Sequence, residues 1–573
     1  MRHPSARLLL LLPVIAGLAA CAPQSKDSAV GAEQRQSQQS SPKRIVAAIR
    51  GDPHTVYQQL NPSSNIPGID ELQQYVHAGL TVMDSQQQRH PVIAEAVPSI
   101  ENGLWRVLPN GSMETTWVIR SGARWQDGTP FTAADLSFTV AVIRDPDLPI
   151  FGEQAYESID RVEAPNDRTV TVTWVRPHIF ADTLFSYDLG LPIPRHLLER
   201  AYLDDKDNFL QHPYWSTEFV GAGPFRLKDW VRGSHLIVEA HPDYVLGRPK
   251  LDEIEVRFIT DPGTLAANML AGAVDMPVGG RLSIEWAIQV RDRWGEGRLE
   301  PVLTNWIVVF PQFISPKPPI VTNLEFRRAL MYAIDRQAQV DTLQYGLSSP
   351  AQSFLYPDQA DYRDIEARVM RYPYDPGRAV RSIEGLGYQK GADGSFRDAA
   401  GQKLSVELRT SQGDDLQEKA MFSTADYWEQ LGVGVEQHFV VPQRARDREY
   451  RATFPGFDVK RNPNDLRGLR GLHSSLTALP ENNFLANGNN SRYVSPEFDA
   501  LIDGVFSTIP KAERTEILGR AIAHIAEHLN LMGLFYNIDP MLIPNRLTNV
   551  MPATGSRSSA SWNAYQWDLK EGG

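Results

Sequence analysis

The segment HIAEH near the C-terminus is the pattern in this sequence that comes nearest to a catalytic metal site. His524, Glu527 and His528 follow the inverted order of a zinc-protease motif, and a helix would place both histidines on one face. So short a pattern arises easily by chance, and a zinc site needs at least three protein ligands in a suitable arrangement. We therefore interpret the segment as part of an amphipathic structural helix.

Other signatures of hydrolytic chemistry are absent from the sequence. It contains neither the Gly-x-Ser-x-Gly turn of serine hydrolases nor the His-Glu-x-x-His motif of zinc proteases. The remaining histidines, such as His438 and His473, are scattered without metal-ligand spacing. We expect a protein with no enzymatic activity, no metal and no cofactor.

Composition and charge narrow the class of protein further. The chain has 573 residues, of which 42% are hydrophobic and 22% charged, as is typical of soluble globular proteins. A chain of this length exceeds a single compact core, so two or three domains are expected. The formal net charge of -12 argues against nucleic acid as a partner, because phosphate binding requires a basic surface.

The N-terminus, MRHPSARLLLLLPVIAGLAAC, has the layout of an export signal. Two arginines precede an apolar run over residues 8–20, which is too short to span a bilayer. The ending LAAC resembles the lipobox of bacterial lipoproteins, and Cys21 is the only cysteine in the chain. We predict a signal peptide over 1–20, with a lipid anchor and flexible tether over 21–43. The mature protein would be exported and held by Cys21 to a lipid bilayer, facing the periplasm or the cell exterior.

Residues 115–140, TTWVIRSGARWQDGTPFTAADLSFTV, predict a strand, a turn and a helix. Trp117 lies in an alternating run, Asp127 and the glycine after it form a turn, and Thr132 with Asp135 suits a helix N-terminus. No nucleophile and base lie together in this segment, so we interpret Asp127 as a turn residue and the segment as scaffold.

The rest of the chain repeats this mixture of helices and strands. Thr322 and Glu325 have the spacing of a capping box, and Asp335 and Asp375 can each begin a helix. Gly432 ends a helical pattern before another strand. Such alternation predicts an α/β or mixed α+β fold.

In this order, the pieces resemble the family 5 solute-binding proteins of bacterial ABC importers. The resemblance includes the segment around Trp117 and also GAGPFRLKDW, LEFRRALMYAIDR, YDPGRAVRSIEGLGY and YWEQLGVGVE. It extends from Arg44 to about Phe457, and more weakly through the C-terminal helices.

This resemblance implies a two-lobed clamp of the periplasmic-binding-protein type, type II. The larger lobe would comprise residues 44–257 and 456–573, the smaller lobe 258–455, with crossings near EVRFITD and FPGFDVK. The lobes would close about this hinge around a solute that they do not transform, and a membrane permease would recognise the closed form. We expect a monomer.

A peptide or peptide-like molecule is the ligand that the resemblance implies first. Relatives on the same scaffold bind nickel chelates, oligosaccharides, opines or conjugated antibiotics, and a fold does not settle its ligand. Two other functions stay open: a secreted, lipid-anchored hydrolase that uses dispersed carboxylates, and a sensor or chaperone with the same fold.

Candidate ligand-binding residues lie around the second crossing. Asp465 is near the position where peptide-binding relatives carry a carboxylate for the peptide's amino terminus, but the tryptophan of their motif is missing. Arg461 and its neighbour Asn462 lie in a basic stretch over 444–470, which we interpret as a solvated surface. The alternative is that Arg461 or a neighbour binds an anionic ligand group. Trp306 could line the cleft, although core packing is its expected role.

Overall fold

The computed structural model describes residues 42–570, apart from 62–65, 152–153, 280–281, 358, 360, 445, 486–487, 553 and 556–558. The predicted signal peptide, the predicted lipidation site Cys21 and the predicted tether up to residue 41 lie outside the described residues. No helix in the described part of the chain combines the length and the apolar character needed to cross a bilayer.

The first sheet joins parallel and antiparallel strands around the beginning of the described chain. Strand β1 (Arg44–Ile49) runs parallel to β10 (Glu253–Phe258) and β11 (Met276–Pro277), and β10, β9 (His235–Ala240) and β8 (Phe225–Val231) are antiparallel. Along β9, buried and half-buried residues alternate, as expected for a strand with one face on a core. Helix α1 (Ile69–Val76) and η12 (Ala560–Gln566) pack into the same core.

A smaller antiparallel sheet contains the segment that the sequence predicts to be scaffold. Its order is β4 (Trp105–Val107), β5 (Met113–Val118), β7 (Thr169–Trp174) and β6 (Ile159–Asn166). The turn leads to α2 (Ala133–Ile143), where the Thr132 main-chain N–H donates to the Asp135 carboxylate over 2.8 Å. Asp127 accepts from the Thr129 N–H over 2.9 Å, which is its role in the turn. The predicted strand, turn and helix are therefore confirmed.

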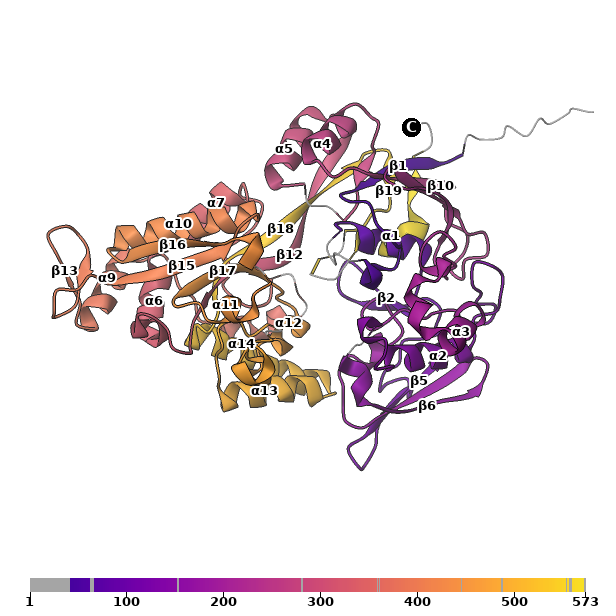
Figure 1. Ribbon diagram of the computed structural model, residues 1–573, viewed down its shortest axis with the longest axis horizontal. Coiled ribbons are helices and arrows are strands. Elements are labelled where there is room, and N and C mark those ends of the chain that lie inside the picture. Colours follow the sequence, from indigo (N-terminus) through magenta and orange to yellow (C-terminus); the bar gives the residue numbers. More distant parts are fainter. Residues whose placement is uncertain are drawn as a thin grey trace, which may run out of the picture. The chain divides into compact units, whose positions relative to one another are not determined.

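Two long strands link the first core to the remaining sheet. The sheet order is β16 (Gly434–Val440), β15 (Ser405–Ser411), β17 (Phe457–Asn462), β12 (Gly297–Pro311) and β18 (Met532–Pro544). Strands β12 and β18 pair antiparallel over nearly their whole length, and Figure 1 shows them side by side between the two groups of elements. One end of β18 contributes Met541 to the first core, and its other end contributes Leu534 to a second core.

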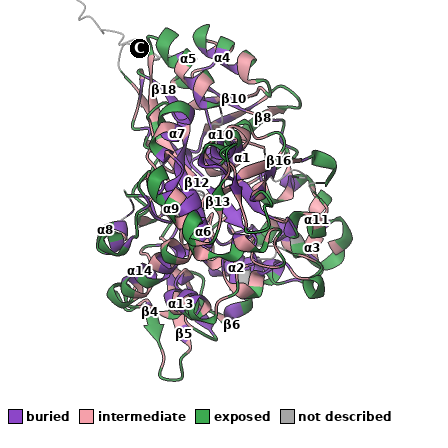
Figure 2. Cartoon of the chain, turned by 90° about the vertical axis from the view of Figure 1, so that its left-hand side faces the viewer, coloured by how far each residue is buried: buried purple, intermediate pink, exposed green. Residues whose placement is uncertain are grey.

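Helices cover the second sheet and form two cores with it. Four of them share the second core: α6 (Leu324–Tyr332), α7 (Arg336–Leu343), α9 (Pro376–Gly385) and α10 (Asp415–Leu431). Helices α13 (Pro496–Ser507) and α14 (Lys511–His528) form the third core with Trp306. Figure 2 shows buried and exposed residues on different sides of helices such as α8 (Tyr362–Ile365) and α13, the pattern of amphipathic surface helices.

The remaining elements are short or lie at the surface. They are β2 (Thr81–Met83), β3 (Arg89–Pro91), α3 (Arg195–Asp204), α4 (Pro262–Leu270), α5 (Ile284–Arg293), β13 (Gln389–Lys390), β14 (Phe396–Arg397), α11 (Arg448–Ala452), α12 (Leu466–Arg470), β19 (Leu547–Thr548) and β20 (Asp568–Leu569).

The predicted helix boundaries are correct except at one helix. Asp335 and Asp375 each accept a hydrogen bond from a main-chain N–H in the first turn of α7 and α9, over 3.0 and 2.8 Å. Gly432 ends α10 with a left-handed φ of 110°, which glycine adopts without strain. The expected capping box of Thr322 and Glu325 is wrong, because Asn323 caps α6 by accepting from the Phe326 N–H over 3.1 Å.

The cores show how the segments near the expected lobe boundaries, 257/258 and 455/456, are packed, and the boundaries themselves stay a prediction. Helices α4 and α5 form a small core with Ala48 of β1 and Leu542 of β18, so they belong with the first sheet. Helices α13 and α14 pack around Trp306 on the second sheet rather than returning to the first core. The chain passes between the cores along β12 and β18, since pairing of two long strands satisfies their main-chain groups throughout the crossing.

Candidate ligand-binding site

Arg461 lies on β17 and forms an ion pair with a carboxylate of the same chain. Its Nε lies 2.7 Å from Asp414 Oδ2, and its Nη2 lies 3.2 Å from the other carboxylate oxygen. Burial by itself would raise the pKa of Asp414, but the hydrogen bond and charge of Arg461 bring it below its ordinary value. The forked guanidinium therefore has an anionic partner within the protein.

Trp306 and Asn462 are opposite each other on β12 and β17. The Trp306 side chain packs in the third core, edge to face with Phe354 at a ring separation of 5.4 Å. Asn462 is buried, and its Nδ2 donates to the Pro463 carbonyl over 2.9 Å. The structure thus brings three of the sequence candidates together on adjacent strands, in positions that stabilise the sheet.

Asp465 marks the start of helix α12. Its Oδ1 accepts from the Gly468 N–H over 2.8 Å, as an N-cap residue does. The helix carries Arg467 and Arg470, the last two cations of the basic stretch. Asp465 therefore fixes the helix that presents these two arginines.

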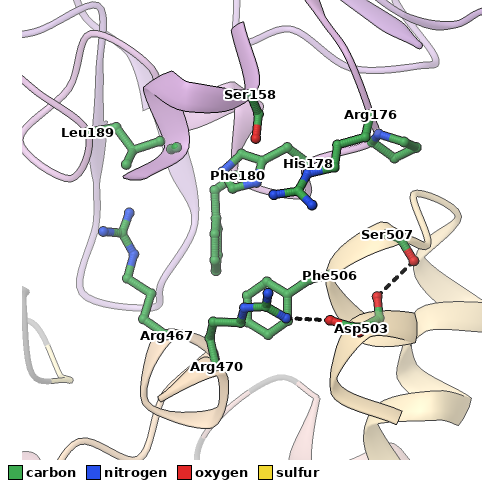
Figure 3. Close-up of a pocket in the computed structure, with 12 residues that line it drawn as sticks. Ser158, Arg176, His178, Phe180, Leu189, Arg467, Arg470, Asp503, Phe506 and Ser507 are labelled. Atoms are coloured by element: carbon green, nitrogen blue, oxygen red, sulfur yellow. Dashed lines mark hydrogen bonds and ion pairs between the residues drawn. The ribbon is translucent and has the colours of Figure 1, made fainter. Parts of the chain in front are cut away.

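Arg467 and Arg470 line a cavity of about 370 Å³ (Figure 3). Its walls come from two parts of the fold, the segment 155–189 of the first core and helices α12 and α13 of the third. The volume lies within the range of small-molecule sites. The lining residues are Ala155, Ser158, Arg176, Pro177, His178, Phe180 and Leu189 on one side and Arg467, Arg470, Asp503, Phe506 and Ser507 on the other.

Each arginine of α12 is placed by a polar contact and an aromatic ring. Arg467 donates from Nη1 to the Asp188 carbonyl over 3.0 Å and lies 5.1 Å from the Phe180 ring centre. Arg470 lies 2.5 Å from the Asp503 carboxylate and 5.6 Å from the Phe506 ring centre. The two distances to ring centres are within the range of cation–π attraction. The contact of Arg467 with Asp188 connects α12 to the first core across the cavity.

Two phenylalanines face each other from the two walls. Phe180 and Phe506 meet edge to face, with ring centres 5.8 Å apart and an interplanar angle of 65°. Such pairs contribute about 1 kcal/mol beyond the area they bury. Their contact gives the cavity an apolar wall beside its cationic groups.

His178 completes the cavity as a neutral imidazole. Burial first, and then the charges of Arg467, Arg176 and Arg470, lower its pKa to about 4. The ring stacks on Trp174 at 5.5 Å, and its buried Nε2 makes no hydrogen bond to any described residue. The three arginines therefore make the potential around this ring positive.

Metal-binding geometry is not found in the described part of the chain, where no group of three or more His, Cys, Asp or Glu side chains could hold an ion. His524 stacks on Phe498 at 4.8 Å, and its Nε2 lies 3.0 Å from the Tyr493 hydroxyl. These contacts give the histidine of the HIAEH segment a packing role.

Several cavity residues are missing from the sequence candidates. Arg176, His178 and Phe180 follow strand β7 in TWVRPHIF, a segment that has no motif spacing. Arg467 and Arg470 were visible only as members of a basic stretch. The available signal was a concentration of cations in an acidic protein, which does not say which of them face a cavity.

Comparison with known proteins identifies the family. A model of the bacterial extracellular solute-binding proteins, family 5, for their middle part, matches residues 97–474, more than half of the chain. The chain belongs to this family. The sequence resemblance is therefore confirmed, and this family 5 protein is a member of an extracellular solute-binding group.

Similar proteins agree with this assignment. A Brucella abortus protein that is named as an ABC transporter peptide-binding protein is 28% identical over 274 residues, 47% of this chain and 48% of that protein. The chain thus spans about half the length of such curated relatives. The oligopeptide-binding protein AppA of Bacillus subtilis is 22% identical over 77% of each chain.

A solved structure shows the same fold. NikA of Brucella suis, solved with Fe(III)-EDTA, has a TM-score of 0.70 and 18% identity, with 92% of this chain and 100% of that chain covered. The expected fold class, a mixed α/β two-lobed solute-binding protein, is confirmed by this similarity.

Proposed function

We propose that this family 5 protein captures a peptide or peptide-like solute outside the cytoplasm and delivers it to the permease of an ABC importer. The observation that carries the proposal is the cavity whose walls belong to two separate hydrophobic cores. A ligand in this cavity contacts both cores at once. Its binding energy therefore favours the arrangement in which they are close, which is the state that a permease would recognise.

Contacts between the cores support a closing motion of this kind. Besides the bond from Arg467 to the Asp188 carbonyl, Lys419 of α10 lies 2.9 Å from Glu285 of α5. The Lys419–Glu285 ion pair is partly exposed, and such pairs contribute at most about 1 kcal/mol. Contacts this weak can form and break, so the ligand would supply the remaining stabilisation of the closed state.

Binding without chemistry is part of the proposal. The Nε2 atom of His178 makes no hydrogen bond to any described residue, and the Ser507 hydroxyl donates to the Asp503 carbonyl over 2.8 Å. A hydrolase would need a nucleophile held next to a base. The hydrolase alternative is therefore less well supported than solute capture.

The ligand class rests on the relatives. The Brucella and Bacillus proteins are named for peptides, which favours a peptide-like solute, and the NikA complex keeps metal chelates as the alternative. Of the sequence candidates, Asp465 enters this proposal as the cap of α12, whereas Arg461, Asn462 and Trp306 enter it as supports of the adjoining sheet.

Native mass spectrometry of the purified full-length protein tests the proposal. We expect a bound compound that is released intact, and a smaller radius of gyration by small-angle scattering when the compound is added back. Turnover of peptides would contradict the proposal, as would a protein that retains no compound and shows no compaction with any peptide offered.

The anchor and the oligomeric state are proposed as well. We infer that Cys21 carries the lipid and that the folded part is a monomer. Replacement of Cys21 by alanine should release the protein from membranes, and light scattering should give the mass of one chain. Membrane retention of the Cys21→Ala variant, or a dimer mass, would contradict these inferences.

A further inference from the structure

The cavity between α12 and the segment 155–189 has a marked positive charge in a protein whose net charge is -12. The charged residues among the described ones that line it are three arginines and one aspartate. His178 adds no charge near neutral pH, because its pKa is about 4. Such a local excess of cations attracts anionic solutes and discriminates against cationic ones.

Two carboxylates near the cavity have an arginine partner that does not line it. Asp182 and Asp188 belong to the same segment as Phe180, but both pair with Arg89, over 3.7 and 3.0 Å. Arg467 also donates to the main-chain carbonyl of Asp188 over 3.0 Å. Among the described residues that line the cavity, Asp503 is the single anion.

In the ion pair of Arg470 and Asp503, an acidic group of a ligand could take the place of Asp503. The Asp503 side chain is 60% exposed, whereas that of Arg470 is 33% exposed. An ion pair so accessible to water contributes little, so a ligand carboxylate or phosphate could replace Asp503 at low cost. A guanidinium forms two parallel hydrogen bonds with such a group.

We propose that the cavity selects an acidic ligand with a planar apolar part, whose acidic group binds the guanidiniums of Arg467, Arg470 and Arg176. The planar part would lie against Phe180 and Phe506, whose rings are already placed edge to face. This inference rests on the proposed capture function and adds the charge of the ligand. The acidic group is a carboxylate or a phosphate, which bind arginine in the same way.

Dipeptides that differ in the charge of one side chain test the selection of acidic ligands by the unmodified protein. Glu-Phe, Gln-Phe and Lys-Phe keep one aromatic ring and change one charge, and phenyl phosphate supplies the phosphate arm. In calorimetric titrations at low salt we expect Glu-Phe to bind about tenfold more tightly than Gln-Phe, and Lys-Phe to bind most weakly. Phenyl phosphate binding without any dipeptide binding would support the inference with phosphate as the acidic group.

Two variants locate the effect. The double variant Arg467→Gln/Arg470→Gln should lose the preference for Glu-Phe. The double variant Arg467→Lys/Arg470→Lys should retain part of it, because the positive charge remains without the forked guanidinium. Arg444→Gln is the matched control. Arg444 also pairs with an aspartate, Asp447 at 3.0 Å, and lies 4.0 Å from the ring centre of Tyr450, but it does not line the cavity.

The experiments distinguish a failure of the selection of acidic ligands from a failure of the proposed solute capture. Equal affinity for Glu-Phe and Lys-Phe, or an unchanged preference in the double glutamine variant, overturns the selection of acidic ligands while capture stands. Binding of none of the four probes also overturns it. In that case native mass spectrometry decides about capture, because a co-purified neutral or cationic compound leaves the capture function intact.

Discussion

Strand β17 and helix α12 are neighbours in the basic stretch but use their cations in opposite ways. On β17, Lys460 lies 2.8 Å from Asp458 and Arg461 lies 2.7 Å from Asp414. On α12, Arg467 and Arg470 line a cavity and contact a carbonyl and an exposed aspartate. The exposure of the carboxylate separates the two groups: the side chains of Asp458 and Asp414 are 1% and 26% exposed, whereas that of Asp503 is 60% exposed and is more easily replaced by a ligand.

The buried charges of β17 form a compact group. Asp458 and Arg409 are almost completely buried, and one oxygen of Asp458 accepts from Arg409 Nε and Nη2 over 3.2 and 3.1 Å. Burial lowers the pKa of Lys460 from its ordinary value, and the charge of Asp458 opposes that change. This group has the character of a structural support, in contrast to the cavity.

The largest effect should come from removing the carboxylate of that group. Asp458→Asn leaves Arg409 and Lys460 buried without an anion, so we expect the free energy of unfolding to fall by about 3 kcal/mol. Urea denaturation followed by circular dichroism measures it. As a control, Asp393→Asn breaks surface pairs with Arg397 and Lys403 and should cost less. Equal losses in the two variants would remove the distinction between buried and exposed pairs.

The pH dependence of stability should show that His178 is kept neutral. Its pKa is about 4 in the folded protein, where burial and then Arg467 lower it, against 6.5 ordinarily. Between these values the unfolded chain binds a proton that the folded chain does not, so stability falls as the pH decreases from 6.5 to 4. Below 4 both states are protonated and the decrease from this group stops.

His178→Gln should therefore reduce the loss of stability over that interval by about 2 kcal/mol. Chemical denaturation at several pH values checks this. Part of the slope should persist, because burial also lowers the pKa of His77 and His524 to about 4. An identical slope in wild type and variant would show that the cavity does not hold His178 neutral.

A smaller effect is expected at the start of α12. Asp465→Ala removes the N-cap, which should cost about 1 kcal/mol of stability. Because the cap positions Arg467 and Arg470, affinity for Glu-Phe should fall as well. Asp465→Asn, which retains a cap, should restore most of both. A loss of stability with unchanged affinity for Glu-Phe would show that the cap does not affect ligand binding in the cavity.

The smallest effect on stability and on ligand affinity is expected at Arg461, which lies on β17 rather than on α12. Arg461→Gln breaks a partly exposed ion pair, so the stability should change by less than about 1 kcal/mol. Calorimetric titration should give the same affinity for Glu-Phe as in the wild type. A marked loss of affinity would place β17 at the ligand and contradict the contrast with α12.

Much of the local structure could be predicted because its causes lie within a few residues. The turn at Asp127 and the helix starts at Asp335 and Asp375 depend on side chains that bond to main-chain groups two or three residues away. The error at Thr322 has the same origin. Asn323, one residue later, also suits an N-cap, and spacing does not choose between two such neighbours.

The family, too, was determined by the sequence, because its motifs record many such local structures in a fixed order. The sequence also located the basic stretch. The division of the chain into two lobes stays a prediction, because it depends on distant contacts such as the pairing of β12 with β18, which joins segments more than 200 residues apart.

Tertiary structure alone decided which cations serve the fold and which face the cavity. Arg461 meets a carboxylate 47 residues away, and Arg467 meets a carbonyl 279 residues away, in a segment without any motif. The charge of an arginine is fixed by its chemistry. Its partner is fixed by what packing brings next to it, and that depends on the whole fold.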